Sequence, residues 1–240
     1  MPIPESNILL AFGAHPDDIE FGCGGVIARE TELGATAHFV VCSRGEAATH
    51  GTPAERVTEA QKGAALLGAT LEFVELGGDA HLDHRIAHVL TFARIIRRIR
   101  PRILLAPTTV EDQHPDHAVV GRIVRDAARL ARYGGVEELR DSPPHAIDQL
   151  LLYAITLDGE PKDGSGFFVD VSEPSILTKW TQAMEAHGSQ SQTRNYVELQ
   201  LTRARLNGLR CGMGHAIVLF PSDPLVVTSL GQLGRAARRF

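Results

Sequence analysis

Cysteine is scarce in this chain, with three residues among 240. Cys23, Cys42 and Cys211 are widely separated and odd in number, and none stands in a Cys-x-x-Cys pair. Neither a disulfide framework nor a zinc site built on cysteine pairs can be assembled from them. We therefore expect a reduced protein.

The sequence also lacks long apolar runs and an excess of positive charge. No run of about 18 apolar residues occurs, so we expect no membrane-spanning helix. The first residues, MPIPESNILLAFG, lack a basic segment and are too briefly apolar for a secretory signal. The net charge of −5 offers no electrostatic footprint for nucleic acid or an anionic membrane. A cytoplasmic protein that binds neither is predicted.

Hydrophobic residues make up 43% of the chain and charged residues 22%. A chain of this length and composition can bury a full core in one large domain. Because no internal repeat or clear linker divides it, we expect one domain over residues 1–240. A local basic run at residues 94–102, which includes Arg97, is interpreted as the solvated face and end of a helix.

Short apolar runs alternate with segments of helical period. Residues 7–13 (NILLAFG) form a continuous apolar run, which is typical of a strand buried on both faces, and residues 19–33 follow as a helix. This alternation predicts an α/β fold: a Rossmann-like, doubly wound, mostly parallel sheet with helices on both faces. Further strands are expected at residues 37–42, 71–76, 102–106, 150–155 and 167–171, and further helices at residues 53–67, 85–99, 117–133, 174–187 and 197–211.

Two clusters of histidine and carboxylate residues follow predicted strands. Residues 14–18 (AHPDD) come directly after the first strand, and residues 113–117 (QHPDH) come after the strand at 102–106 and a short loop. Ligands of open α/β sheets bind at the carboxyl ends of the strands. The fold therefore brings the two clusters to one edge of the sheet, although about a hundred residues separate them.

The residue types in these clusters suit a catalytic metal. A catalytic zinc commonly takes three nitrogen or oxygen ligands from protein and activates a water at the fourth position. One of Asp17 and Asp18 can bind the metal while the other takes a proton from the attacking water. One of His114 and His117 can bind it while the other, as an imidazolium, stabilises the developing oxyanion. Asp116 can hold that imidazole in its tautomer.

These and neighbouring motifs also have other interpretations. His-Pro-Asp is also an ordinary helix-capping sequence, but two such clusters at two strand ends favour a site. The glycines at residues 22–25 (GCGG) lack the Lys-Ser/Thr of a phosphate loop and indicate close helix packing instead. His81 and His84, in a polar HLDH segment, are interpreted as an incidental surface pair. His187 is assigned no role.

With these residues, the chain resembles the LmbE-like, or PIG-L, superfamily of zinc-dependent N-acetylglucosaminyl deacetylases. The family's AHPDD motif and the glycine-rich helix after it stand at residues 14–25, and its HPDH motif stands at residues 114–117. Looser similarity continues at residues 169–172 (VDVS), through Lys179 and His187 to Ser189-Gln190, and over residues 203–212. The match thus runs over nearly the whole chain.

The resemblance implies a role for each of these residues. His15, Asp18 and His117 would bind zinc, with Fe²⁺ as the alternative metal in vivo. Asp17 would be the general base and would later give its proton to the amine. His114 would stabilise the oxyanion, with Asp116 as its orienting partner.

Substrate contacts are expected at two further positions. Arg56 matches a family position that contacts sugar hydroxyls, although an exposed helix arginine is an equal alternative. Many sugar-thiol deacetylases carry arginine just before HPDH, where this chain has Gln113. Residues 215–220 (HAIVLF) replace the family's frequent Ala-Glu-Ala-Phe. Both departures lie where the substrate would be selected.

The sequence thus predicts an enzyme that hydrolyses the N-acetyl group of an N-acetylglucosamine-type sugar or its conjugate with zinc-activated water. The resemblance also implies a homo-oligomer. Two alternatives stay open. The first is a metal-dependent amidase on a non-sugar amide such as an antibiotic precursor. The second is a non-catalytic module that binds metal or sugar.

Overall fold

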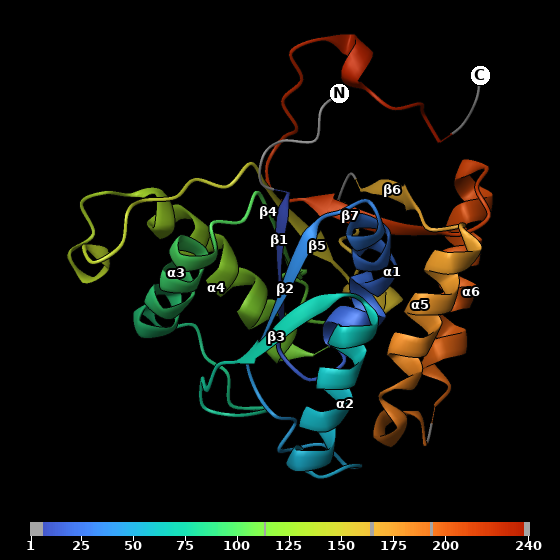
Figure 1. Cartoon of the computed structure of the whole chain (residues 1–240), viewed down its shortest axis with the longest axis horizontal. Helices are drawn as coiled ribbons and strands as arrows, with labels where there is room; N and C mark the ends of the chain where they lie inside the picture. The colour runs from blue at the N-terminus through green and yellow to red at the C-terminus, as the bar shows by residue number, and fades with distance from the viewer. Residues whose placement is uncertain (1–6, 113, 164–165, 193, 238–240) are drawn as a thin grey trace.

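The computed structural model describes residues 7–237 apart from residues 113, 164–165 and 193. Within these residues, seven strands form one sheet that α-helices flank (Figure 1). The strands are β1 (Ile8–Gly13), β2 (Thr36–Val41), β3 (Ala69–Phe73), β4 (Ile103–Pro107), β5 (Gln149–Tyr153), β6 (Phe167–Asp170) and β7 (Ala216–Pro221). The helices are α1 (Asp18–Glu32), α2 (Pro53–Leu66), α3 (Ile86–Ile99), α4 (Pro115–Arg132), α5 (Pro174–Glu185) and α6 (Tyr196–Cys211).

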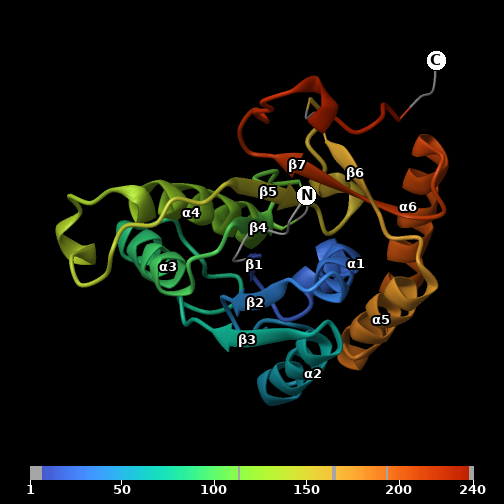
Figure 2. The ribbon, with the colours of Figure 1, turned by 45° about the horizontal axis from the view of Figure 1, so that its top comes forward.

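The sheet has the order β3-β2-β1-β4-β5-β7-β6. Strands β1 to β5 are parallel to their neighbours, whereas β7 runs antiparallel to both β5 and β6. Helices α3 and α4 cover one face, and α1, α2, α5 and α6 lie on the other (Figures 1 and 2). The predicted doubly wound, mostly parallel sheet is confirmed. Strand β7 is an addition that the sequence pattern did not predict.

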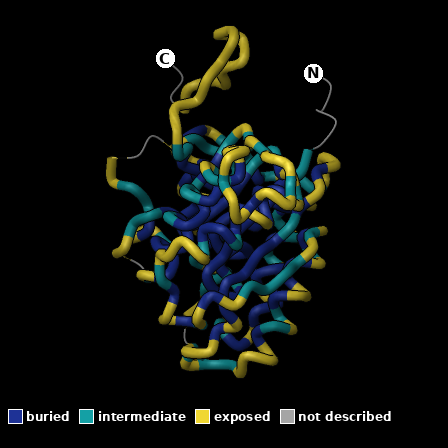
Figure 3. The backbone as a smooth tube through the Cα atoms, turned by 90° about the vertical axis from the view of Figure 1, so that its left-hand side faces the viewer, coloured by how far each residue is buried: buried dark blue, intermediate teal, exposed yellow. Residues whose placement is uncertain are grey.

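Each face of the sheet has its own hydrophobic core. Leu9 and Ala11 of β1 belong to the cluster beneath α1 and α5, and Leu10 and Phe12 belong to the cluster beneath α3 and α4. The Phe12 ring lies 4.6 Å from the ring of Phe92 between centroids. Figure 3 shows that the buried part of the backbone lies at the centre of the molecule. The continuous apolar run of β1 thus reflects burial on both faces.

The order in which strands are added to the sheet reverses between β1 and β4. From β1 it continues to β2 and β3 on one side, and it returns to β4 on the other side of β1. Leu9 pairs in register with Ile103, so both strands end at the same edge of the sheet. Such a switch point is where open α/β sheets bind ligands.

The glycines of α1 allow close packing, as the sequence indicated. A Cβ atom on Gly22 would lie 2.2 Å from Cδ2 of Tyr153, and one on Gly24 would lie 2.8 Å from Cδ1 of Trp180. No other residue could occupy either position without displacing a buried ring. These glycines therefore fix how α1 packs on the sheet.

Arg97 corrects the interpretation of residues 94–102 as a solvated surface. Its side chain is buried, with 3% of the residue exposed, and its guanidinium donates to backbone carbonyls in the last turn of α4 and in the segment after it. The acceptors are the carbonyl oxygens of Ala131, Tyr133, Leu139 and Ser142. Arg97 therefore holds the segment that leads from α4 towards β5, whereas the side chain of Arg98 beside it is 59% exposed.

We expect the Arg97→Met substitution to lower the free energy of unfolding by about 3 kcal/mol, because several buried carbonyls lose a charged donor. The matched control is Arg98→Met, which removes a surface ion pair with Glu72 and should cost about 1 kcal/mol or less. Urea denaturation followed by circular dichroism measures both. Equal effects of the two substitutions would contradict the role given to Arg97.

Beyond β7 lies a C-terminal arm, residues 222–237, that extends away from the rest of the molecule (Figures 1 and 3). It contains the 3-10 turn Leu230–Gln232. Its large apolar side chains are exposed, with Val226 87% and Leu230 80% accessible. Among the described residues, no helix is long and apolar enough to cross a membrane.

Candidate active site

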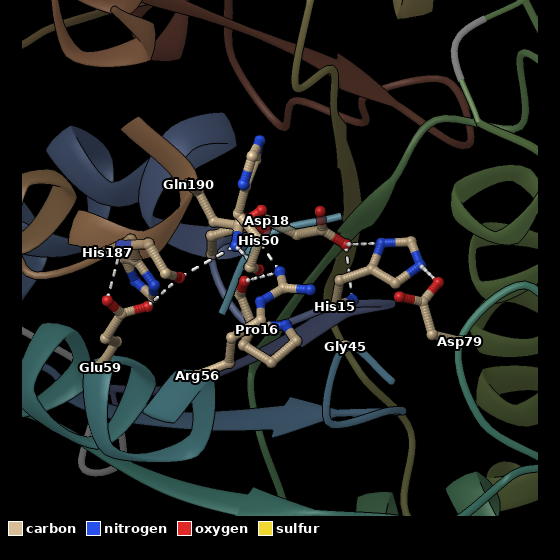
Figure 4. Close-up of polar contacts among 12 residues, drawn as sticks. His15, Pro16, Asp18, Gly45, His50, Arg56, Glu59, Asp79, His187 and Gln190 are labelled. Carbon is tan, nitrogen blue, oxygen red and sulfur yellow. Dashed lines mark hydrogen bonds and ion pairs between the residues drawn. The ribbon is translucent and has the colours of Figure 1, made fainter. Parts of the chain in front are cut away.

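The two sequence clusters meet at the switch point between β1 and β4. Residues 14–18 form the turn from β1 into α1, and residues 114–117 begin α4. Gln113 lies outside the described residues, so its predicted substrate contact stays a prediction. Figure 4 shows His15 between Asp18 and Asp79, and Arg56 beside Pro16.

His15, Asp18 and His117 form a compact buried group. Nδ1 of His15 lies 3.3 Å from Nε2 of His117, and that same Nε2 lies 3.0 Å from Oδ1 of Asp18. Oδ2 of Asp18 accepts hydrogen bonds from the backbone amides of Ala14 and His15, at 2.8 and 2.9 Å. The turn itself therefore fixes the carboxylate and leaves Oδ1 facing the His117 ring.

The donor atoms of this group fit a metal ion. Burial raises the pKa of Asp18, but His117 and His15 outweigh burial and hold that pKa well below its ordinary value. An ionised carboxylate and two ring nitrogens thus converge, and their ligand atoms all lie within 4.8 Å of one another. The 3.3 Å between the ring nitrogens matches the edge of a tetrahedron with zinc–nitrogen bonds of about 2.0–2.1 Å. The group could therefore hold a metal ion.

The second nitrogen of His15 is held by carboxylates. Nε2 lies 3.1 Å from Oδ1 of Asp79 and 3.2 Å from Oδ2 of Asp116. Burial lowers the pKa of His15, but these carboxylates and Asp18 raise it well above the ordinary value. Hydrogen bonds of this kind place the proton on Nε2 and leave the Nδ1 lone pair for a metal.

The partner of Asp116 differs from the one expected. Its carboxylate contacts His15 and the backbone amide of Ala80, whereas its own backbone amide donates to Nδ1 of His114. The reason is that His114 is the N-cap residue of α4, so its ring lies against the first turn. Asp79 was missed because it belongs to no motif. The sequence feature that could have identified Asp79 is its position in the Gly77-Gly78-Asp79 loop, which follows a predicted strand and so lies at the same edge of the sheet.

The capping bond of His114 also determines its tautomer. Because Nδ1 accepts a hydrogen bond from Asp116, the neutral ring carries its hydrogen on Nε2. Burial lowers the pKa of His114, and the charges of His15 and His117 lower it further. His114, which lines the cavity, can thus act as a neutral hydrogen-bond donor, whereas an imidazolium was expected from the sequence.

Asp17 begins α1 in a strained conformation. Its backbone has φ 119° and ψ −29°, in a region that non-glycine residues rarely adopt and that costs about 1–3 kcal/mol. Burial and the neighbouring Asp18 raise the pKa of Asp17 to about 6. The carboxylate lines the same cavity as the metal-binding group, with its side chain 15% exposed.

Arg56 is not the exposed helix arginine that the sequence left open. It lies on α2, is 3% exposed, and its Nη2 donates to the carbonyl oxygen of Pro16 at 2.8 Å and to Oδ2 of Asp17 at 3.2 Å. The guanidinium therefore contacts both the backbone and the side chain of the strained turn. Figure 4 shows it beside Pro16.

Residues 187–190 contact α1, α2 and the loop at residues 43–52 next to the site. His187 is fully buried, with Nε2 3.4 Å from Oε1 of Glu20. Next to it, Gln190 donates to the carbonyl oxygen of His50 at 2.9 Å, and the amide and hydroxyl of Ser189 donate to Glu59 on α2. The segment thus fastens the loop at residues 43–52 to α2 (Figure 4). By contrast, His84 pairs with Asp126 at the surface, and Nδ1 of His81 lies 2.9 Å from the carbonyl oxygen of Asp79.

A cavity of about 540 Å³ opens above these groups. This volume is within the range of small-molecule sites. Its base carries the metal-binding group, Asp17 and His114. The walls are formed by mixed polar and apolar residues, among them Ala47, Thr49, Asp112, Ile155, Thr156, Asp158, Gln190, Arg194 and Tyr196.

Comparison with known proteins agrees with this geometry. Residues 10–128 match the family described as "PIG-L: GlcNAc-PI de-N-acetylase". The chain belongs to the PIG-L family. The match spans β1 to most of α4, and thus includes both histidine clusters.

Individual relatives extend the likeness along this PIG-L chain. Diacetylchitobiose deacetylase from Thermococcus kodakarensis is 25% identical over 201 residues, which cover 79% of this chain and 72% of that protein. 4-Oxalmesaconate hydratase from Pseudomonas putida is 28% identical over 159 residues, 60% of this chain and 61% of that protein. The crystal structure of the conserved protein TT1542 from Thermus thermophilus superposes with a TM-score of 0.81 at 29% identity, covering 95% of this chain and 99% of that one.

Proposed function

We propose that this protein is a zinc-dependent deacetylase that hydrolyses the N-acetyl group of an N-acetylglucosamine-type amino sugar or its conjugate. The observation that carries the proposal is the group of His15, Asp18 and His117 at the base of an open cavity, with the carboxylate of Asp17 beside it. The diacetylchitobiose deacetylase relative supports an acetylated amino sugar as the substrate class. We also propose that residues 1–240 act as one catalytic domain.

His15, Asp18 and His117 would hold the zinc ion. When bound there, zinc supplies Lewis acidity, which polarises a carbonyl oxygen and acidifies water. Asp17 would accept a proton from the attacking water and later deliver it to the nitrogen of the departing amine. A pKa of about 6 suits both transfers, since a general base works best with a pKa near the operating pH.

His114 would stabilise the oxyanion that forms as water adds to the acetyl carbon. Its Nε2–H would donate to the carbonyl oxygen as that oxygen gains negative charge. Asp79 and Asp116 would act through His15, whose ring they orient. The products balance as acetate and the free amino sugar, with the proton from water ending on the amine.

A second candidate reaction is hydration of a carbon–carbon double bond, which the similarity to 4-oxalmesaconate hydratase favours. Hydration adds water without releasing acetate, so product analysis separates the two reactions. The non-sugar amidase and the non-catalytic binding module, both left open by the sequence, are separated by the same experiment.

The zinc-loaded protein should be incubated with acetylated chitobiose, free N-acetylglucosamine, a glycolipid mimic, N-acetyl amino acids and an unsaturated dicarboxylate. Acetate and primary amine are measured for the amides, and loss of ultraviolet absorbance for the dicarboxylate. We expect equal amounts of acetate and amine from at least one sugar. Turnover of only the acetyl amino acids or only the dicarboxylate would overturn the proposal of a sugar substrate. No turnover of any compound in the panel would favour the non-catalytic binding module.

We further propose that copies of the chain associate through the C-terminal arm. Leu225, Val226, Leu230 and Leu233 on the arm are all more than half exposed. A cavity of about 640 Å³ also lies between α5 and α6. Its apolar lining residues Val197 and Leu201 suit the apolar side chains of the arm of another copy.

Light scattering of the purified chain should give a mass above that of one copy. Changing Val226, Leu230 and Leu233 together to serine should return the mass to that of a monomer, because the apolar contacts are lost. Leu33→Ser, at an exposed leucine at the end of α1, is the control and should leave the mass unchanged. A monomeric wild-type chain would contradict the proposal.

A further inference from the structure

We propose that Arg56 is a positioning residue that holds the strained turn at Asp17, and that Gly45 is required because only glycine leaves room for the Arg56 guanidinium. The proposal deepens the proposed function, because its catalytic consequence depends on Asp17 acting as the base. Neither the structural role of Arg56 nor that of Gly45 follows from the sequence motifs.

The contacts of Arg56 are directed at its own chain. One nitrogen, Nη2, reaches both the carbonyl oxygen of Pro16, at 2.8 Å, and Oδ2 of Asp17, at 3.2 Å. The first acceptor belongs to the residue before Asp17 and the second to the side chain of Asp17 itself, whose backbone φ of 119° is otherwise unfavourable. A buried cation that binds both therefore favours the strained turn over a relaxed one.

Gly45 lies against the guanidinium of Arg56 and leaves room for it because it has no side chain. A Cβ atom at this position would lie 1.9 Å from Nη1 and 2.4 Å from Cζ of Arg56. Gly45 also has φ +72°, so two independent features require glycine. The guanidinium is the end of a flexible side chain, so an alanine at residue 45 would displace it rather than rearrange the sheet. Gly45 does not line the cavity, whereas Arg56 does.

This arrangement differs from a direct substrate contact by Arg56. Loss of a residue that binds the substrate and the transition state equally well raises KM and leaves kcat unchanged. Displacement of the general base instead lowers kcat. Loss of Arg56 through its effect on Asp17 should therefore lower kcat and leave KM almost unchanged. Displacing the reacting groups by about 1 Å can cost about 100-fold in rate.

The test is a double-mutant cycle with Gly45→Ala and Arg56→Ala in the zinc-loaded full chain. Gly45→Ala alone should lower kcat about 10- to 100-fold, with KM within about twofold. In the Arg56→Ala background, adding Gly45→Ala should have little further effect, because the group that it displaces is already gone. Guanidinium ion added to the Arg56→Ala variant should restore part of kcat, which a purely structural role would not allow.

Gly68→Ala is the matched control for backbone strain. Gly68 has the same φ of +72°, but its added Cβ would meet only ordinary contacts, the nearest being Cβ of Thr31 at 3.6 Å. Both alanine variants should lose a similar amount of thermal stability. Only Gly45→Ala should lose kcat. Equal loss of kcat in both variants, a rise in KM with kcat unchanged, or additive effects in the cycle would overturn the proposal.

Hydrogen exchange supplies a readout that does not depend on activity. The amides of residues 14–21 at the Asp17 turn should exchange faster in Gly45→Ala and Arg56→Ala than in wild type or Gly68→Ala. If wild type hydrolyses none of the acetylated sugars, the proposed function fails, while faster exchange would still support the positioning of the turn by Arg56. Unchanged exchange in both variants would overturn that positioning in either case.

Discussion

Replacing Asp17 by asparagine should lower kcat for deacetylation by about 10²- to 10⁴-fold while the metal stays bound, because the amide cannot accept the proton of the attacking water. Asparagine has nearly the same shape as aspartate and can still accept a hydrogen bond from Arg56 through its side-chain oxygen. The strained turn should therefore persist. Steady-state kinetics on the best substrate of the panel, with metal content measured in parallel, gives the result.

Asp83→Asn is the control for this substitution, since Asp83 is an exposed carboxylate outside the cavity. It should keep the wild-type kcat. Asp17→Asn with full activity and bound metal would remove Asp17 as the base. Loss of metal from Asp17→Asn would instead place this residue among the ligands.

Replacing His117 by alanine should abolish stoichiometric zinc binding and, with it, the deacetylase activity. The change removes one of three ligands and leaves a buried carboxylate, Asp18, beside a single ring, His15. His84→Ala is the control, because this histidine side chain is 39% exposed and pairs with Asp126 at the surface. Elemental analysis after gel filtration gives zinc per chain, and calorimetry gives the affinity.

Zinc should also stabilise the wild-type fold and not the His117→Ala variant. A ligand present at about 100 times its Kd raises the free energy of unfolding by about 2.7 kcal/mol. The melting temperature of the wild type should thus fall when a chelator removes the metal, and that of His117→Ala should not respond. A His117→Ala chain that binds one zinc as tightly as wild type would contradict the ligand assignment.

Local sequence patterns predicted most of what positions the site. The apolar run at residues 7–13 and the alternation of strands with helices are local signals, and the parallel sheet follows from them. The carboxyl ends of β1 and β4 then had to share an edge of the sheet. As a result, Nδ1 of His15 and Nε2 of His117 lie 3.3 Å apart, although 102 positions separate the two residues in the sequence. These features were predictable because each depends on a short segment and a general rule of topology.

The features that were missed depend on partners distant in the sequence. Arg97 is buried because carbonyls of residues 131–142, more than thirty positions away, accept its hydrogen bonds. Asp79 joins the site because the loop after β3 bends towards His15. Arg56 is buried because the loop at residues 43–52 folds over it, with Gly45 against its guanidinium. No pattern of period or spacing carries such information.

Strand β7 was missed for a different reason. Residues 215–220 were interpreted as a departure from a family motif at the substrate site, although AIVLF has the composition of a buried strand. In the structure this segment pairs antiparallel with β5 and β6 and completes the sheet. Pairing order and direction at the edge of a mixed sheet depend on how a long connection returns, which a local pattern does not encode.

The decisive experiment is a titration of metal-free protein with zinc while acetate release from the best acetylated sugar is followed. If His15, Asp18 and His117 form one catalytic site, the rate should rise from near zero and reach its plateau at one zinc per chain. Acetate release at the full rate by the metal-free protein would contradict the zinc-dependent mechanism, as would zinc binding that leaves the rate at zero.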